Sequence, residues 1–356
     1  MRKPKVLYVF AFRSSFIIKD ENLLKEEFEV VSLFFNPLPR WKTPLSLLKQ
    51  LFQLLVYLPS SKAVVCQFAG FHTLLPTLLG KVFRKRVYLV LLGAECHNYP
   101  GIQHGNFRKK ALAAVTRLSF RWAFKLLPIH ESLARFENRY DPSEPVHQGF
   151  LSLVPGLKTP YKVIPHGFDD VLFHPKAAAQ RKPRSFITAA SSIAPPVFQR
   201  KGIDLFIEMA RRFPDCSFSL LCRNDYLDTH QLPPNLKILE AVPYAELPSV
   251  LASHQFYVQV SIAEGLPNAL CEAMLCGCIP IGSNVFAIPE IIGDSGFVCR
   301  TKNADTLELV INNALTANLN THEVNAQRRI QENYPIKIRK ALLIEEINNI
   351  SSQKAK

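Results

Sequence analysis

Two carboxylates, Glu264 and Glu272, stand eight residues apart in the stretch Ser261-Ile-Ala-Glu-Gly-Leu-Pro-Asn-Ala-Leu-Cys-Glu-Ala-Met-Leu-Cys-Gly277. Asn268 is a good helix-capping residue and Gly277 suits a helix end, so a helix is predicted to follow a loop that carries Glu264. The helix is rich in Ala, Leu, Cys and Met, which is typical of a buried helix rather than one with a solvated face. Both carboxylates are therefore predicted to line a cleft.

The chemistry of this stretch suits a ligand with several hydroxyl groups and a phosphate. Carboxylates accept hydrogen bonds from pairs of hydroxyls, and the backbone N–H groups that open a helix attract phosphate. A nucleotide sugar combines a sugar, a ribose diol and a diphosphate. The pattern therefore predicts a nucleotide-sugar site.

Three segments resemble one known family in the same order along the chain. Residues 261–292 resemble the C-terminal signature of the retaining, family-4-like glycosyltransferases (group 1). Residues 161–175, Tyr-Lys-Val-Ile-Pro-His-Gly-Phe-Asp-Asp-Val-Leu-Phe-His-Pro, resemble its domain-joining segment, and residues 199–208, Gln-Arg-Lys-Gly-Ile-Asp-Leu-Phe-Ile-Glu, resemble its lysine loop. The resemblance implies an α/β GT-B architecture, in which two Rossmann-like domains face each other across a cleft.

Length and strand pattern agree with two domains. A chain of 356 residues exceeds the size of one ordinary core. Apolar runs separated by helical patterns predict parallel sheets. The expected strands are 6–12, 30–35, 63–68 and 87–92 in the first half and 185–190, 217–222, 236–239, 256–260 and 279–282 in the second. We expect an acceptor-binding domain over 1–165, a nucleotide-sugar-binding domain over 166–335, and a C-terminal helix over 336–356 that crosses back.

Charge, cysteine and hydropathy patterns narrow the class of protein. Residues 1–165 contain 24 Lys and Arg against 10 Asp and Glu, whereas the remaining residues contain 19 of each. The eight cysteines mostly lie in apolar runs without zinc spacing, which indicates a reducing compartment. No apolar run reaches the length of a membrane span, and the N-terminus suits a first strand better than a signal peptide. A cytoplasmic protein, peripheral on the inner face of the plasma membrane, is predicted.

The resemblance assigns roles at the donor site. It implies that Glu264 holds the transferred sugar, that Glu272 holds the ribose hydroxyls, and that Lys201 binds the diphosphate beside a helix N-terminus. Relatives carry a Gly-Arg pair where this chain has Ser191 and Ser192, so either Arg200 or the serine hydroxyls replace that cation. Glu264, Lys201 and Arg200 are the predicted catalytic residues. The predicted donor-binding residues are Glu272, Asn268, Ala269, Leu270, Ser191, Ser192, Pro267 and Gly265.

No cofactor or metal is expected at this site, because the nucleotide sugar is a substrate and no D-x-D motif is present. Asp225 and Asp228 are too loosely placed to form one. The nucleobase is expected near residues 222–223 and 241–243. Phe286 stands where relatives carry glycine, so it either narrows the sugar pocket or shifts its loop.

The acceptor half carries fewer motifs. The candidate cleft residues are Arg13, Ser14, Gly93, Glu95 and His97. Relatives carry a histidine just before the glycine that corresponds to Gly93, and this chain has Leu92 there. His97 is the alternative histidine, and His130 is expected to pack at a strand end.

Residues 107–125 form a basic amphipathic pattern, and residues 40–52 form a weaker one. Such helices suit an anionic membrane surface, although ordinary packed helices with solvated charges show the same pattern. The positive charge of the first half favours the membrane. Nucleic acid is not favoured as a partner, because no nucleic-acid motif accompanies the charge.

The predicted function is transfer of a sugar from a nucleotide diphosphate sugar to a glycan or lipid-linked acceptor, with retention of configuration, in bacterial envelope polysaccharide (lipopolysaccharide) synthesis. Two alternatives remain open at this point. One is a nucleotide-sugar epimerase or hydrolase of the same fold, and the other is a non-catalytic nucleotide-sugar-binding paralogue. The missing histidine favours the non-catalytic protein, whereas Glu264, Glu272 and Lys201 oppose it.

Overall fold

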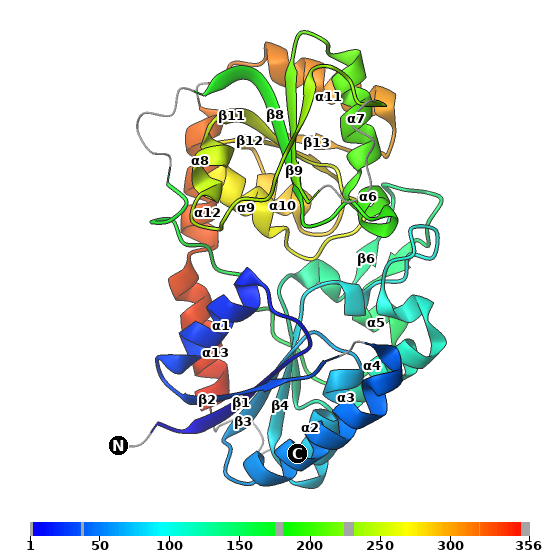
Figure 1. Cartoon of the computed structure of the whole chain (residues 1–356), viewed down its shortest axis with the longest axis vertical. Coiled ribbons are helices and arrows are strands. Elements are labelled where there is room, and N and C mark those ends of the chain that lie inside the picture. Colours follow the sequence, from blue (N-terminus) through cyan, green and yellow to red (C-terminus); the bar gives the residue numbers. More distant parts are fainter. Residues whose placement is uncertain (1–2, 37–38, 175–180, 224–230, 320, 350–356) are drawn as a thin grey trace.

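The first half of the chain forms a five-stranded parallel sheet (Figure 1). A computed structural model describes residues 3–36, 39–174, 181–223, 231–319 and 321–349. The strand order is β2-β1-β3-β4-β5. The strands are β1 (Lys5–Phe10), β2 (Glu29–Phe34), β3 (Ala63–Gln67), β4 (Arg86–Leu91) and β5 (Lys125–Pro128).

Helices cover both faces of this sheet, as the near-continuous apolar sequences of its central strands require. All five residues of β3 are buried, as are five of the six in β1. Helix α1 packs against α13, and α3 packs against α2 and α4. The helices are α1 (Ser15–Lys25), α2 (Thr43–Tyr57), α3 (Phe71–Val82), α4 (Lys110–Trp122), α5 (Phe150–Leu153) and α13 (Ile336–Asn348). A small antiparallel pair joins β6 (Phe136–Glu137) to β7 (His147–Gln148).

The second half forms a six-stranded parallel sheet in the order β10-β9-β8-β11-β12-β13. Its strands are β8 (Lys182–Ala190), β9 (Ser217–Cys222), β10 (Leu236–Leu239), β11 (His254–Gln259), β12 (Ile279–Ser283) and β13 (Phe297–Cys299). Its helices are α6 (Pro195–Lys201), α7 (Ile203–Arg212), α8 (Leu247–Ala252), α9 (Asn268–Leu275), α10 (Ile288–Ile292), α11 (Ala304–Thr316) and α12 (His322–Asn333). The predicted α/β class with two parallel sheets is confirmed.

The sequence patterns predicted most of the strands but missed several short elements. The predicted strands 217–222 and 236–239 match β9 and β10. The first strand ends at Phe10 rather than at Phe12, because the chain turns there. Strand β13 and helix α6 were not predicted, since three and seven residues are too few to show a clear period. Asp225 and Asp228 lie outside the described residues.

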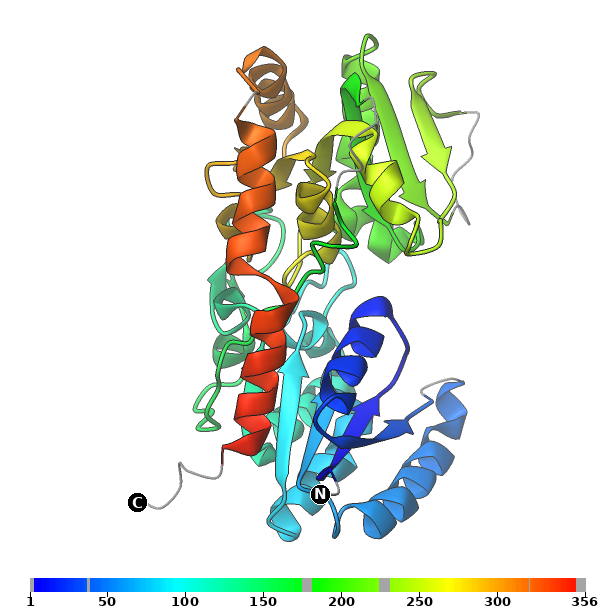
Figure 2. The ribbon, with the colours of Figure 1, turned by 90° about the vertical axis from the view of Figure 1, so that its left-hand side faces the viewer.

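Two segments of the chain, residues 167–168 and residues 334–336, run side by side between the two halves. Phe168 N donates to Tyr334 O at 2.9 Å, and Ile336 N donates to Phe168 O at 3.1 Å. A Cβ atom on Gly167 would lie 2.6 Å from the Cα atom of Ile336, so only glycine fits this contact. Helices α12 and α13 follow each other along the length of the molecule, α12 beside the second sheet and α13 beside the first (Figure 2).

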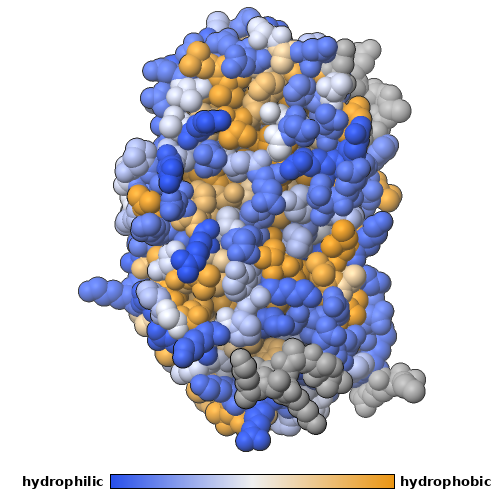
Figure 3. Space-filling view, turned by 180° about the vertical axis from the view of Figure 1, so that it is seen from behind, coloured by the Kyte–Doolittle hydropathy of each residue, from blue (hydrophilic) through white to orange (hydrophobic). Residues whose placement is uncertain are grey.

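The surface seen from behind shows apolar side chains in separate groups among hydrophilic ones (Figure 3). All eight cysteines are buried, and none of them forms a disulfide in the part of the chain that the structure describes. Within the described ranges, no helix is long and apolar enough to cross a bilayer.

Candidate active site

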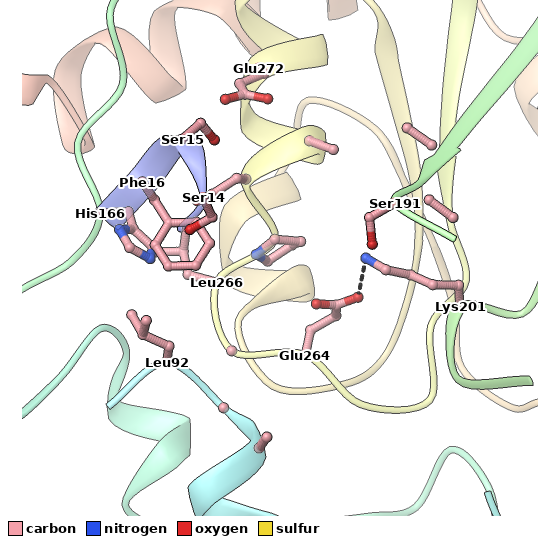
Figure 4. A pocket seen from close by; sticks show the side chains of 18 of the residues that line it. Ser14, Ser15, Phe16, Leu92, His166, Ser191, Lys201, Glu264, Leu266 and Glu272 are labelled. Atoms are coloured by element: carbon pink, nitrogen blue, oxygen red, sulfur yellow. Dashed lines mark hydrogen bonds and ion pairs between the residues drawn. The ribbon is translucent and has the colours of Figure 1, made fainter. Parts of the chain in front are cut away.

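A cavity of about 730 Å³ lies where the two halves meet. This volume falls in the range of small-molecule sites. Ligands of open parallel sheets bind at the carboxyl ends of the strands, and both sheets present these ends here. The cavity wall includes most of the predicted site residues: Arg13, Ser14, Gly93, His97, Ser191, Arg200, Lys201, Glu264, Gly265, Pro267, Asn268, Ala269 and Glu272. Figure 4 shows Glu264, Lys201 and Glu272 of the second half in one cavity with Ser14 of the first half and His166 of the domain-joining segment.

The loop before α9 reaches across to the first half. A Cβ atom on Gly265 would lie 2.0 Å from the carbonyl oxygen of Leu92, so only glycine allows this approach. Helix α9 then begins at Asn268, with Pro267 rather than Asn268 in the capping position. No side chain caps this end, and Asn268 Oδ1 is buried without a hydrogen-bond partner among the described residues. The first N–H groups of α9 thus remain available to an anion in the cavity.

Glu264 is the centre of a compact charged cluster. Its Oε1 atom accepts hydrogen bonds from Lys201 Nζ at 2.7 Å and from Ser261 Oγ at 2.9 Å. Gln259 Nε2 lies 3.2 Å and Arg200 Nη1 3.5 Å from the same oxygen. Both cations come from the last turn of α6. The predicted catalytic residues are therefore brought together.

Gly202 directs the lysine into this cluster. The residue separates α6 from α7 and has a φ of +67°. A side chain there would meet the carbonyl oxygen of Val260 at 2.3 Å. Lys201 is thus held where the chain passes the end of β11, next to the loop that carries Glu264.

Burial and the neighbouring cations shift the pKa of the Glu264 carboxyl in opposite directions. Burial raises its pKa, but Lys201 and Arg200 together outweigh burial and hold the pKa below its usual value. Burial also lowers the pKa of Lys201, and Glu264 offsets part of that effect. Glu264 is therefore ionised at neutral pH and neutralises cations that would otherwise attract an anion.

Glu272 lies one helical turn deeper, and Tyr244 orients its carboxyl group. Tyr244 Oη donates to Glu272 Oε1 at 2.7 Å. Burial raises the pKa of Glu272 to about 7, while Tyr244 and the nearby Lys19 of α1 act in the opposite direction. The carboxylate is thus available to accept hydrogen bonds from a ligand mainly at neutral pH and above.

The wall from the first half is aromatic and includes histidines. His97 Nδ1 lies 3.2 Å from His104 Nε2, and His97 Nε2 is buried without a partner in the described part of the chain. Burial lowers the pKa of His97 well below its usual value and that of His104 to about 3. Both rings are therefore neutral at physiological pH, and His97 retains one unused ring nitrogen at the cavity.

Part of the chain is similar to a known family. Residues 185–317 match the family described as glycosyl transferases group 1. The match covers little more than a third of the chain and lies within its second half. The phosphatidylinositol N-acetylglucosaminyltransferase of Arabidopsis thaliana has a subunit that is 27% identical over 171 residues, which cover 44% of this chain and 37% of the relative. O-antigen chain mannosyltransferase B of Escherichia coli is 35% identical over 72 residues, which cover 20% of this chain and 19% of the relative. The matched part thus spans little more than a third of these relatives at most.

Solved structures of the same fold cover nearly the whole chain. Sucrose-phosphate synthase from Thermosynechococcus elongatus superposes with a TM-score of 0.77 at 14% identity, covering 97% of this chain and 98% of the other. Anabaena HepE, solved in complex with UDP and glucose, gives a TM-score of 0.73 at 15% identity, and the superposition covers 98% of this chain and 100% of the other. The GT-B architecture expected from the sequence is confirmed.

Three of the predicted site residues do not line the cavity. Glu95 is fully buried, its Oε1 atom accepts the N–H of Leu92 at 2.7 Å, and burial raises its pKa to about 7. Ser192 Oγ accepts the N–H of Ala194 at 3.1 Å. The side chain of Leu270 lies in the core. These three side chains therefore do not form part of the cavity wall.

Phe286 and His130 are also not among the residues that line the cavity. Phe286 has a φ of +46° and stacks on Phe136 at 4.1 Å between ring centres, with His97 at 4.5 Å. Its ring thus joins the second half to the first instead of narrowing the sugar pocket. His130 follows β5 and lies 3.1 Å from Glu290 Oε2 in the second half.

Sequence reasoning missed several residues of the site. Lys19, Tyr244, His104 and His166 come from different elements and form no motif with Glu264 or Glu272. His166 belongs to the predicted domain-joining segment, and its side chain lines the cavity. Of the expected nucleobase region, Ala241 and Val242 line the cavity, together with Leu221.

Proposed function

We propose that this protein transfers a sugar from a nucleotide diphosphate sugar to a glycan or lipid-linked acceptor with retention of configuration. One observation carries the proposal. Glu264, its two cations, the uncapped start of α9 and Glu272 all line one cavity. This arrangement suits the diphosphate, the ribose and the transferred sugar at once.

We assign the donor to the wall formed by residues of the second half. Lys201 and Arg200 would turn from Glu264 to the diphosphate and stabilise the charge that develops on the leaving group. Glu272, oriented by Tyr244, would accept hydrogen bonds from the ribose hydroxyls. Ala241 and Val242 would lie beside the base. The complex of Anabaena HepE with UDP-glucose supports this class of donor.

Retention fits a donor-phosphate-assisted transfer, in which the departing diphosphate oxygen takes the proton of the attacking hydroxyl on the same face. The protein then mainly positions the substrates and stabilises charge. Glu264 would hold the transferred sugar near the reacting carbon. We propose that residues 166–335 bind the donor and that residues 1–165 bind the acceptor. Residues 336–356 would then cross back to the acceptor-binding half.

We place the acceptor against the wall from the first half. Arg13 and Ser14 supply polar groups there, and Phe12 lies 4.8 Å from Phe68 between ring centres. Phe68 has a φ of +62°, a strained backbone conformation of the kind that clusters at functional sites. His97, neutral and with one free nitrogen, would contact the sugar or the acceptor hydroxyl.

The relatives' names support an acceptor at a membrane. One is named for transfer to phosphatidylinositol and another for an O-antigen chain. We therefore propose a cytoplasmic protein that acts in envelope polysaccharide synthesis and docks peripherally on the inner face of the plasma membrane through its basic half.

The experiment is a turnover assay with UDP-, GDP- and ADP-sugars, with and without simple glycoside or lipid-extract acceptors, followed by NMR of the anomeric centre. We expect release of one nucleoside diphosphate and a product with the anomeric configuration of the donor. Inverted product would contradict the mechanism. Interconversion of the sugar would support an epimerase, and tight binding without any release would support a non-catalytic binder.

A further inference from the structure

Helix α2 presents its apolar side to solvent. Four side chains follow one stripe, and their exposed fractions are 75% for Trp41, 64% for Leu45, 63% for Leu48 and 70% for Phe52. Their spacing of three and four residues places them on one face. Figure 2 shows this helix at the outer edge of the N-terminal half, at the lower right. Contiguous exposed apolar surface of this kind marks an interaction site.

The buried side of the same helix confirms that this orientation is built into the fold. Of the residues of α2, only Gln50 and Leu54 are buried. Gln50 Nε2 donates to the carbonyl oxygen of His72 at 2.8 Å, which ties the helix to the start of α3. Gln50 and Leu54 face the protein while Leu45, Leu48 and Phe52 face outward, so the helix exposes more apolar side chains than an ordinary surface helix does.

Cations surround this apolar stripe. Lys42 Nζ lies 5.0 Å from the centre of the Trp41 ring, and Lys49 lies on the helix itself. At the other end, Lys85 Nζ donates to the carbonyl oxygen of Ser61 at 2.9 Å, which brings the end of α3 next to the end of α2. Exposed Val82 and Phe83 lie there beside further Lys and Arg residues.

The charge of the region selects the occupant. The 65 residues between Glu29 and Glu95 contain no Asp or Glu and eight Lys or Arg. An anionic bilayer complements an apolar face with a basic border, because apolar side chains enter the acyl boundary while cations meet the headgroups. A second copy of this chain would bring the same positive charge to the contact.

We propose that α2, with Trp41 before it, inserts its exposed apolar stripe into the surface of an anionic bilayer. The proposal deepens the membrane association given above by naming the element that inserts. It would hold the acceptor-binding half of the cavity close to lipid-linked acceptors.

The test is flotation of the full chain with vesicles of phosphatidylcholine alone or mixed equally with phosphatidylglycerol, without nucleotide. The chain has two tryptophans, so a Trp122→Phe variant makes emission report Trp41 alone. We expect binding only to the anionic vesicles, weakened by salt, with a blue shift of the Trp41 emission. The Leu48→Gln/Phe52→Gln variant is expected to bind at least about tenfold more weakly, given the apolar burial lost.

The matched control is Val171→Gln/Leu309→Gln, which changes two exposed apolar residues elsewhere. This control is expected to bind vesicles like the parent. Absence of vesicle binding, or equal binding by the α2 variant, would overturn the proposal. A concentration-dependent dimer that the α2 substitutions dissolve would also overturn it, in favour of a second copy. Because no nucleotide or turnover is involved, the outcome is independent of the transfer activity.

Discussion

Replacing Glu264 by alanine is expected to reduce sugar transfer by at least about 10²–10³-fold, the size of effect seen when one preorganised polar group is lost from an active site. Glu264 receives hydrogen bonds from Lys201, Ser261 and Gln259, so its position is fixed by three partners. Turnover of the preferred donor measures the loss. Glu264→Gln, which keeps the shape but not the charge, is expected to be similarly impaired.

Binding of the nucleoside diphosphate should respond differently from turnover. Without Glu264, Lys201 and Arg200 lose the anion that neutralises them, and a diphosphate can take its place. Affinity is therefore expected to stay equal or increase while transfer falls. The matched control is Glu240→Ala, an exposed glutamate next to Ala241 of the cavity wall. Undiminished transfer by Glu264→Ala would refute the assigned role.

Replacing Arg339 by alanine is expected to lower the free energy of unfolding by about 3–5 kcal/mol, because it leaves Asp20 buried without its counter-charge. Arg339 is 1% exposed on α13, and its Nε donates to Asp20 Oδ1 of α1 at 2.6 Å. Its Nη1 also donates to the carbonyl oxygens of Ile164 at 3.0 Å and Pro165 at 2.9 Å. This one side chain therefore joins the crossing helix, the first helix and the domain-joining segment.

Urea unfolding followed by circular dichroism measures this effect. The neighbouring Lys340 pairs with Glu26 at the surface, where solvent screens the charges, so Lys340→Ala is expected to cost far less than Arg339→Ala. The double variant Asp20→Leu/Arg339→Met, which removes both charges, is expected to recover much of the loss. A cost for Arg339→Ala no greater than that for Lys340→Ala would contradict the role of the ion pair.

Local sequence signals pointed to several residues that line the second-half wall of the cavity. Glu264, Gly265 and Glu272 lie within nine consecutive residues, and Lys201 directly precedes a glycine and a helix. Short-range patterns of this kind determine a loop, a helix start and the direction of a side chain. These local signals indicated each residue separately, whereas the resemblance to a known family is what placed Lys201 and Glu264, 63 positions apart, at one site.

The partners that orient these groups depend on long-range contacts. Tyr244 reaches Glu272 across 28 positions, and Arg339 reaches Asp20 across 319. No local period or spacing encodes such pairs, because parallel strands and crossing helices bring them together only in the folded chain. The position of the Phe286 ring could not be predicted from the sequence for the same reason, since it packs on Phe136 of the other half.

The central claim is that the cavity binds a nucleotide diphosphate sugar, and calorimetric titration with UDP, GDP and ADP tests it most directly. We expect one nucleotide to bind selectively, with affinity lowered at least about tenfold in both Lys201→Ala and Glu272→Ala. Because the raised pKa of Glu272 is about 7, the carboxylate that accepts the ribose hydroxyls is lost as pH falls. Affinity should therefore drop roughly tenfold between pH 8 and pH 6 in the parent and not in Glu272→Ala. Failure of all three nucleotides to bind, or equal binding by both variants, would contradict the account.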